Sequence, residues 1–207
     1  MEKDILQAAG RAFVELTKIE YHIILGRKGH TTTLNVVFQP ENFYHLAGLH
    51  KLKMRYDFQQ RTSAWILSNI VKGKISVNQI EQDENYIKVY ARLLALMNLA
   101  AIIEDDDTKF YAYEHKKVFF ATKIVADYLA KGSCNNEIIT FSFFVKEADR
   151  YCVNSIFPME NYDYSMRQTQ YTVLLKEKIV YIGGEKIRNE LYRHKKYMNG
   201  GEGNEQT

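Results

Sequence analysis

The spacing of the apolar residues changes from a helical period to a strand-like period near residue 109, and this change constrains the fold most. Before it, helical periodicity runs over 4–18, 63–71 and 85–103, with two β-rich runs at 21–25 and 32–38. After it come strand-like runs at 110–113, 118–129, 138–145, 151–157 and 171–182. The pattern predicts an α+β fold, in which a helical N-terminal half is followed by a four- to five-stranded antiparallel sheet.

The chain has 207 residues, 46% of them hydrophobic, and only two prolines, so it can bury one good-sized core. We expect a single domain over 1–183, with a helical part at 40–105 and a sheet part at 109–182. The segment 184–207 is predicted to form a basic helix and a disordered polar tail. The basic stretch 26–30 lies between the two early β-rich runs and is typical of a hairpin turn.

Charge and cysteine content exclude several classes of protein. The net charge of +3 is too small to indicate nucleic-acid binding by itself. Cys134 and Cys152 are too few for a disulfide scaffold or a structural zinc site. The N-terminus does not read as a signal peptide, and no apolar run of membrane-spanning length is free of charge. We therefore expect a reduced, cytoplasmic protein that does not associate with membranes.

The segment 39–52 contains two histidines and a lysine in one predicted helix. Pro40 suits the first helical turn, and His45 and His50 fall on the two flanks of an apolar arc. Half-buried histidines with shifted pKa values are candidates for general acid and base catalysis. The alternative is a pair of core-edge histidines with satisfied hydrogen bonds. A shared metal ion is not expected, because residues five apart point about 140° away from each other around a helix.

Further candidate residues lie in the C-terminal half. In the predicted strand 122–128, Lys123 and Asp127 share one face, which is either functional or simply solvated. The polar and aromatic segment after Ser155 suits a phosphate and an unstacked base, or is an ordinary surface loop. The acidic run 104–107 is more typical of a helix stop than of a magnesium site. We find no glycine-rich phosphate loop and no nucleophile elbow, and we expect no cofactor and no metal.

Four short segments occur in an order that resembles a phage-associated family of barnase, EndoU, colicin and RelE-like (BECR-fold) nucleases. They read F-Y-H-L-A-G-L-H-K-L at 43–52, T-K-I-V-A-D-Y at 122–128, S-I-F at 155–157 and Q-T-Q-Y-T-V at 168–173. The first is the most specific. The third differs from the expected S-F-F without touching the serine. The resemblance runs over roughly residues 4–178.

The resemblance implies a helical front, a four-stranded antiparallel sheet, and a metal-independent endoribonuclease or toxin-like effector of a phage or mobile element. The positions that match the motifs give the candidate catalytic residues His45, Lys123 and Ser155, supported by His50, Asp127 and Gln168. Such an enzyme would cleave RNA through attack of the 2′-hydroxyl, with a histidine transferring the proton and a cation stabilising the phosphorane.

RNA is the expected partner, and an immunity or inhibitor protein is a further candidate. The residues expected to contact nucleic acid are Arg27, Lys28, Lys51, Tyr164, Arg167 and Tyr171. Two other functions stay open: a non-catalytic RNA-binding or protein-interaction module of the same fold, and a sheet that assembles subunits.

Overall fold

The computed structural model describes residues 4–134 and 138–197. The helices are α1 (Ile5–Leu16), α2 (Phe43–Leu46), α3 (Ser63–Val71), α4 (Tyr86–Met97) and α5 (Leu99–Glu104). The strands are β1 (Ile19–Arg27), β2 (His30–Val37), β3 (Lys109–Ala112), β4 (Tyr128–Cys134), β5 (Ile138–Glu147), β6 (Arg150–Pro158), β7 (Thr169–Ile182) and β8 (Glu185–Arg193). Short 3-10 turns at Pro40–Asn42 and Leu49–Lys51 flank α2.

The strands form one sheet that closes on itself. Their hydrogen-bonded order is β1-β2-β6-β5-β4-β3-β7-β8, and β7 also pairs with β1. Seven strands therefore make a barrel, with one parallel pairing, Val36 with Tyr151 and Val37 with Cys152, between β2 and β6. The prediction of a helical half followed by a four- to five-stranded sheet was wrong. The early hairpin is not separate from the sheet, because β1 has β2 on one edge and β7 on the other, and closure leaves neither edge unpaired.

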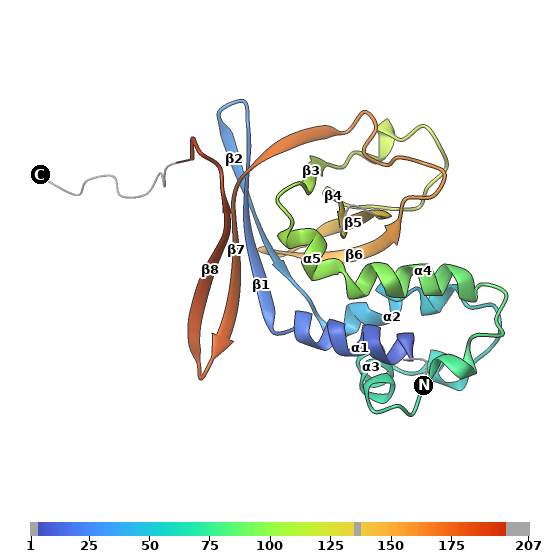
Figure 1. The fold of residues 1–207 in the computed structure, drawn as a ribbon. Helices are drawn as coiled ribbons and strands as arrows, with labels where there is room; N and C mark the ends of the chain where they lie inside the picture. The colour runs from blue at the N-terminus through green and yellow to red at the C-terminus, as the bar shows by residue number, and fades with distance from the viewer. Residues whose placement is uncertain (1–3, 135–137, 198–207) are drawn as a thin grey trace, which may run out of the picture.

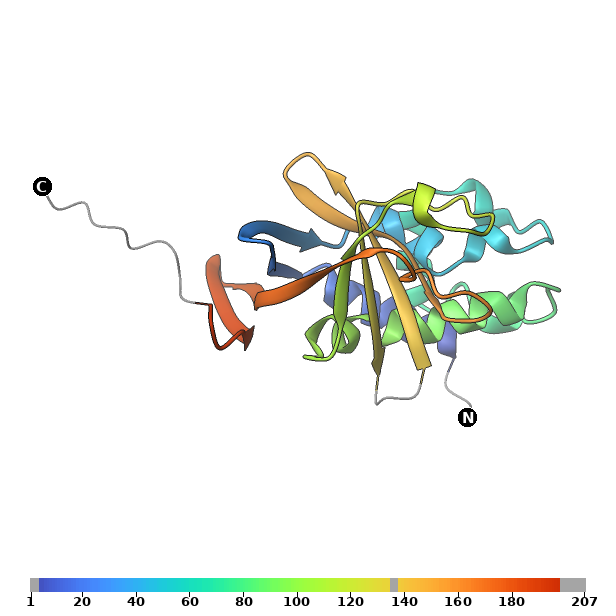
Figure 2. The same cartoon turned by 90° about the horizontal axis from the view of Figure 1, so that it is seen from above.

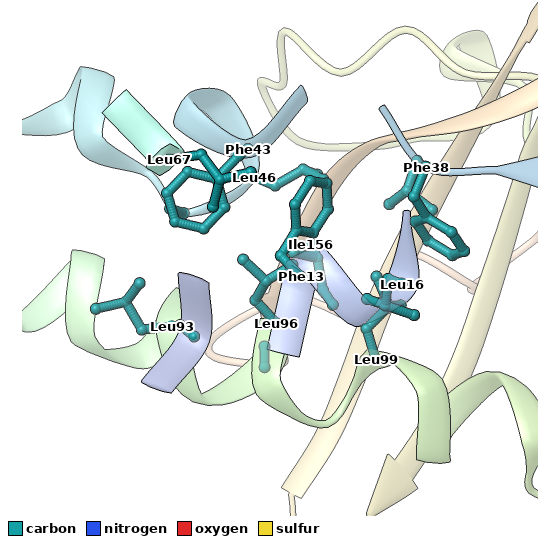
Figure 3. Close-up of a cluster of buried hydrophobic side chains, with 14 of the residues drawn as sticks. Phe13, Leu16, Phe38, Phe43, Leu46, Leu67, Leu93, Leu96, Leu99 and Ile156 are labelled. Atoms are coloured by element: carbon teal, nitrogen blue, oxygen red, sulfur yellow. The ribbon is translucent and has the colours of Figure 1, made fainter. Parts of the chain in front are cut away.

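The main core lies between the helices and the inner side of the sheet. Phe13 and Leu16 of α1 meet Leu93 and Leu96 of α4, and Ile156 of β6 closes the cluster from the sheet (Figure 3). All five side chains are at least 97% buried, so this cluster supplies much of the hydrophobic stabilisation of the fold. The first helix begins where Asp4 accepts a hydrogen bond from the backbone N–H of Gln7, a typical N-cap.

Several elements lie where the sequence placed them, and others do not. Helices α1 and α3 and the β1–β2 hairpin confirm their predictions. The single helix expected over 85–103 is two helices, because the backbone departs from helical geometry at Asn98. The strand expected over 118–129 is wrong for most of its length, since the ladder begins only at Tyr128. The acidic run is a helix stop, as expected, with Glu104 as the last residue of α5.

The basic helix predicted after residue 183 is also wrong. Glu185–Arg193 is strand β8, antiparallel to β7, and lies on the side of the molecule opposite the helices (Figures 1 and 2). Its charges are compatible with a strand because they face solvent and neighbouring strands, as in the 2.7 Å ion pair between Arg188 and Glu177. The predicted disordered tail falls mostly at 198–207, outside the described residues. Over the described ranges, no helix has the length and apolar character needed to cross a membrane.

Candidate active site

The histidine segment is not one continuous helix, as the sequence suggested. Helix α2 ends at Leu46, and Gly48 then adopts a left-handed conformation with φ of 76° before the second 3-10 turn begins at Leu49. Glycine is suited to this position because it lacks the Cβ that makes positive φ unfavourable for other residues. The chain therefore turns sharply between the two histidines.

The turn at Gly48 brings His45 and His50 face to face. Their ring centroids lie 4.0 Å apart and the ring planes differ by 7°, which is a stacked arrangement. The helical wheel had placed the two side chains on separate flanks, so the prediction that they point apart was wrong. Both residues are partly exposed, which agrees with the expected half burial. The structure thus creates a histidine pair that opens to solvent.

Hydrogen bonds fix the segment at both ends. At its start, the backbone N–H of Tyr44 donates to Ser63 Oγ at 2.9 Å, and that hydroxyl donates to the carbonyl of Pro40 at 2.8 Å. At its end, Asn85 Nδ2 donates to the carbonyl of Lys51 at 2.7 Å. The histidine pair is therefore held between the N-terminus of α3 and the N-terminus of α4, which suits a preorganised site.

The surroundings of the pair favour neutral imidazoles. Partial burial lowers the pKa of His45, and the positive charges of Arg92 and Lys51 lower it further. Burial, followed by His45, Lys51 and Arg92, lowers the pKa of His50 to about 4, although the carbonyl of Tyr44 accepts a hydrogen bond from its ring. Near neutral pH both rings are therefore uncharged, the protonation state that a general base requires.

A pocket of about 510 Å³ with a cationic lining includes Lys51 and Arg92, whose charges act on both histidines, although neither histidine is among its lining residues. Lys51 and its neighbours contribute four positive groups, whereas Glu160 is the one acidic side chain among the lining residues. The charged and aromatic lining residues are Lys51, Lys88, Arg92, Lys123, Glu160, Phe157, Tyr162 and Tyr164. They come from the 3-10 turn Leu49–Lys51, from α4, from the loop between β3 and β4, and from the end of β6 with the segment that follows it.

Arg92 connects the histidine pair to the pocket. It is 8% exposed, and its guanidinium carbon lies 5.2 Å from the ring centroid of Phe157. A Cβ at position 48 would come within 2.5 Å of Arg92 Cδ, so the glycine also makes room for this side chain. Burial lowers the pKa of Arg92 to about 10, which leaves it protonated at neutral pH. Its Nη1 is buried and finds no hydrogen-bond acceptor among the described residues.

Lys123 lines the pocket from a loop, not from the predicted strand. Residues 121–126 belong to no helix or strand, and the expected alternation of exposure persists, with Lys123 exposed between the less exposed Thr122 and Ile124. The loop is held by Asn154 Nδ2, which donates to the carbonyl of Val125 at 2.8 Å. The predicted position of Lys123 in a site is thus compatible with the structure, although by a different backbone.

Three of the other predicted catalytic residues occupy different positions. Asp127 accepts a hydrogen bond from the backbone N–H of Lys146 at 2.7 Å, which ties the loop to β5. Gln168 uses both ends of its amide on the backbone of Glu114, at 2.8 Å and 3.2 Å. Ser155 is 7% exposed on β6 and is not among the residues that line the pocket. The side chains of Asp127 and Gln168 therefore hold the scaffold in this structure.

The predicted nucleic-acid contacts divide in the same way. Lys51 and Tyr164 line the pocket. Tyr171 packs against the main core, with its ring centroid 6.1 Å from that of Tyr128. Arg167 is exposed and lies 5.6 Å from the ring centroid of Phe119. Arg27 and Lys28 line a separate, more open pocket at the β1–β2 turn.

Most residues that line the pocket were not predicted from the sequence. Arg92 was visible as a single arginine within the apolar stretch Tyr86–Met97, which is the one signal that could have identified it. Lys88 and Glu160 carried no sequence signal, and Phe157 stood out only as the last residue of the S-I-F motif, because only the packing of α4 against β6 brings these residues together. Within the described ranges there is no group of three or more histidine, cysteine, aspartate or glutamate residues that could hold a metal ion.

One protein family matches almost the whole described part of the chain. The family model described as PBECR4, phage-Barnase-EndoU-ColicinE5/D-RelE like nuclease4, matches residues 5–191. No curated protein and no solved structure matches the chain. The match confirms the resemblance of the four motifs and extends beyond it into β8. The chain belongs to this phage-type BECR nuclease family.

Proposed function

We propose that this protein is a metal-independent endoribonuclease of a phage or mobile element, and that RNA is cleaved where the histidine pair meets the cationic pocket. The observation that carries the proposal is the stacked pair of His45 and His50, whose pKa values are lowered, beside the buried positive charge of Arg92. A neutral base close to a surface that attracts phosphate supports this proposal.

His45 acts as the general base. Its neutral ring takes the proton of the RNA 2′-hydroxyl, and the 2′-oxygen then forms a bond to the adjacent phosphorus. The bond from phosphorus to the 5′-oxygen breaks, and the histidine pair returns the proton to that oxygen. Because burial and the positive charges of Arg92 and Lys51 lower the pKa of His45, its protonated ring readily releases that proton. The products are a 2′,3′-cyclic phosphate and a 5′-hydroxyl.

The cations stabilise the charge that develops on phosphorus. Arg92 is fixed by its packing on Phe157, and Lys123 lies across the same pocket on a loop held by Asn154. Positive groups in a partly dry site interact more strongly with a developing anion than they would in water. Lys51 adds a third charge next to His50 in the chain.

The test is incubation of mixed RNA with the protein in excess EDTA, with 2′,3′-cyclic phosphate ends as the readout. The wild type is compared with His45→Ala and Lys123→Ala, and Lys28→Ala serves as a control because it removes a lysine remote from the pocket. Cleavage that survives EDTA and is lost in the first two variants supports the proposal. Absence of cleavage, or cleavage equal in all preparations, contradicts it.

A non-catalytic RNA-binding module is the second candidate, and one observation favours it. Of the motif residues, Asp127 and Gln168 are held in hydrogen bonds to the backbone, and Ser155 does not line the pocket. A module of this kind would bind RNA and protect it from other nucleases without forming new ends. RNA retention in a filter-binding assay, with no cyclic phosphate detected, would support this alternative.

A further inference from the structure

A buried cation without an acceptor marks the inner end of the pocket. Arg92 is more than nine-tenths buried, and its Nη1 finds no hydrogen-bond partner among the described residues. A buried donor that stays unpaired is costly, so such groups usually bind something from outside the chain. The guanidinium group matches the geometry of a phosphate, because its N–H groups can donate to two oxygens at once.

The charge around Arg92 suits an anion. Lys51, Lys88 and Lys123 line the same pocket, and Glu160 supplies one negative charge against these four cations. Burial and the charges of Arg92 and Lys88 lower the pKa of Lys51, as expected where cations lie close together without enough counter-charge. An anion bound here would relieve that repulsion.

An aromatic wall faces the same space. Tyr162 lines the pocket and is 50% exposed, and Phe120 stacks on one face of its ring with centroids 4.2 Å apart and planes 16° apart. Phe120 also contacts Tyr164, whose ring packs edge-on against Phe141 and Phe157. The ring of Tyr162 is therefore supported on one face by packed aromatic side chains. Exposed aromatic rings of this kind bind unpaired bases by stacking.

We propose that this pocket binds one unpaired nucleotide, with its phosphate on Arg92 and its base on the ring of Tyr162. The inference rests on the proposed function and specifies its substrate as single-stranded at this position. The pocket of about 510 Å³ lies within the range of roughly 300–1,000 Å³ that is usual for small-molecule sites. A base paired in a duplex would have to unstack before it could enter.

Binding is measured without any cleavage step, by isothermal titration with the four ribonucleoside 5′-monophosphates, inorganic phosphate and adenosine. The wild type is compared with Tyr162→Ala and Arg92→Gln, and Tyr181→Ala is the control because it removes another half-exposed tyrosine, on β7. We expect Tyr162→Ala to weaken nucleotide binding roughly 5- to 100-fold and to leave phosphate binding unchanged. Arg92→Gln should weaken the binding of both nucleotide and phosphate.

Two outcomes would overturn the inference: nucleotide binding no tighter than phosphate binding in the wild type, or nucleotide binding unaffected by Tyr162→Ala. If Arg92→Gln fails to fold by circular dichroism, the tyrosine comparison still decides. Because a monophosphate contains no bond for the enzyme to cleave, nucleotide binding can hold even where the EDTA assay shows no cleavage. That result would reject the nuclease proposal and keep the nucleotide site.

Discussion

Two basic regions of the chain, the pocket beside the histidine pair and the turn of the β1–β2 hairpin, carry similar residues in different surroundings. At the turn, Arg27 and Lys28 are exposed, and the arginine already donates to the carbonyl of Gln170 at 3.0 Å. In the pocket, Arg92 is buried, and its Nη1 has no hydrogen-bond acceptor among the described residues. Positive charge alone therefore does not define a phosphate site. Partial removal from water and an unpaired donor distinguish the pocket.

His45 lies beside the pocket and His30 lies at the hairpin turn. Substituting each of these histidines should give the largest difference in cleavage rate between the two regions. We expect His45→Ala to lower the cleavage rate about 10²- to 10⁴-fold, the usual effect of losing a proton-transfer group. His30→Ala at the exposed end of the hairpin should leave the rate unchanged. Initial rates on a fluorescent single-stranded RNA measure both. Similar losses in the two variants would remove the distinction between the regions.

Each region also contains a glycine with positive φ, which separates backbone strain from crowding. Gly29→Ala should cost about 1 kcal/mol of unfolding free energy, because φ is +80° and no atom lies within 4 Å of the added Cβ. Gly48→Ala should cost about 3 kcal/mol, because the new Cβ also meets Arg92 Cδ at 2.5 Å. Urea unfolding gives both values. Equal costs would show that Arg92 moves aside freely.

The lysines of the two regions are both exposed, so they test whether the position of a charge at the pocket matters. Lys123→Ala should lower the cleavage rate on the order of tenfold to hundredfold, because its charge lies in the pocket where the phosphorane forms. Lys28→Ala should change the rate by less than about twofold at physiological salt, because its charge lies at the separate pocket of the hairpin and salt screens it from the site of cleavage. The measurement is the rate at several salt concentrations. A larger effect of Lys28→Ala would favour a binding surface at the hairpin.

The lowered pKa of His50 predicts a small dependence of stability on pH. With a pKa of about 4 in the folded protein and an ordinary value of 6.5, the folded state binds fewer protons than the unfolded state between these limits. The free energy of unfolding is therefore highest above pH 6.5 and declines as the pH falls toward 4. After allowance for solvent screening, the size of this decline is about 1 kcal/mol or less. His50→Ala should therefore lose less stability than the wild type between pH 7 and pH 4.5 in urea unfolding. An equal loss would contradict the pKa shift.

Local sequence signals predicted those elements whose form depends on neighbouring residues. Asp4 marks the start of α1, and the apolar period identifies α1, α3 and most strands. Only some of the residues that the motifs identified line the pocket. Lys123 lines the pocket, whereas Gln168 donates to and accepts from the backbone of Glu114. Sequence pattern cannot separate these outcomes, because a polar residue in a motif serves equally well for a substrate and for the scaffold.

The family, the candidate histidines and the basic character of the hairpin turn could be predicted, since each depends on a short stretch of the chain. The closed barrel, the stacking of His45 on His50 and the burial of Arg92 could not be predicted. These features depend on contacts between distant segments: β7 pairing with β1, and α4 packing against β6. A helical wheel separates the two histidines. The left-handed Gly48, which makes room for Arg92 from another helix, joins them.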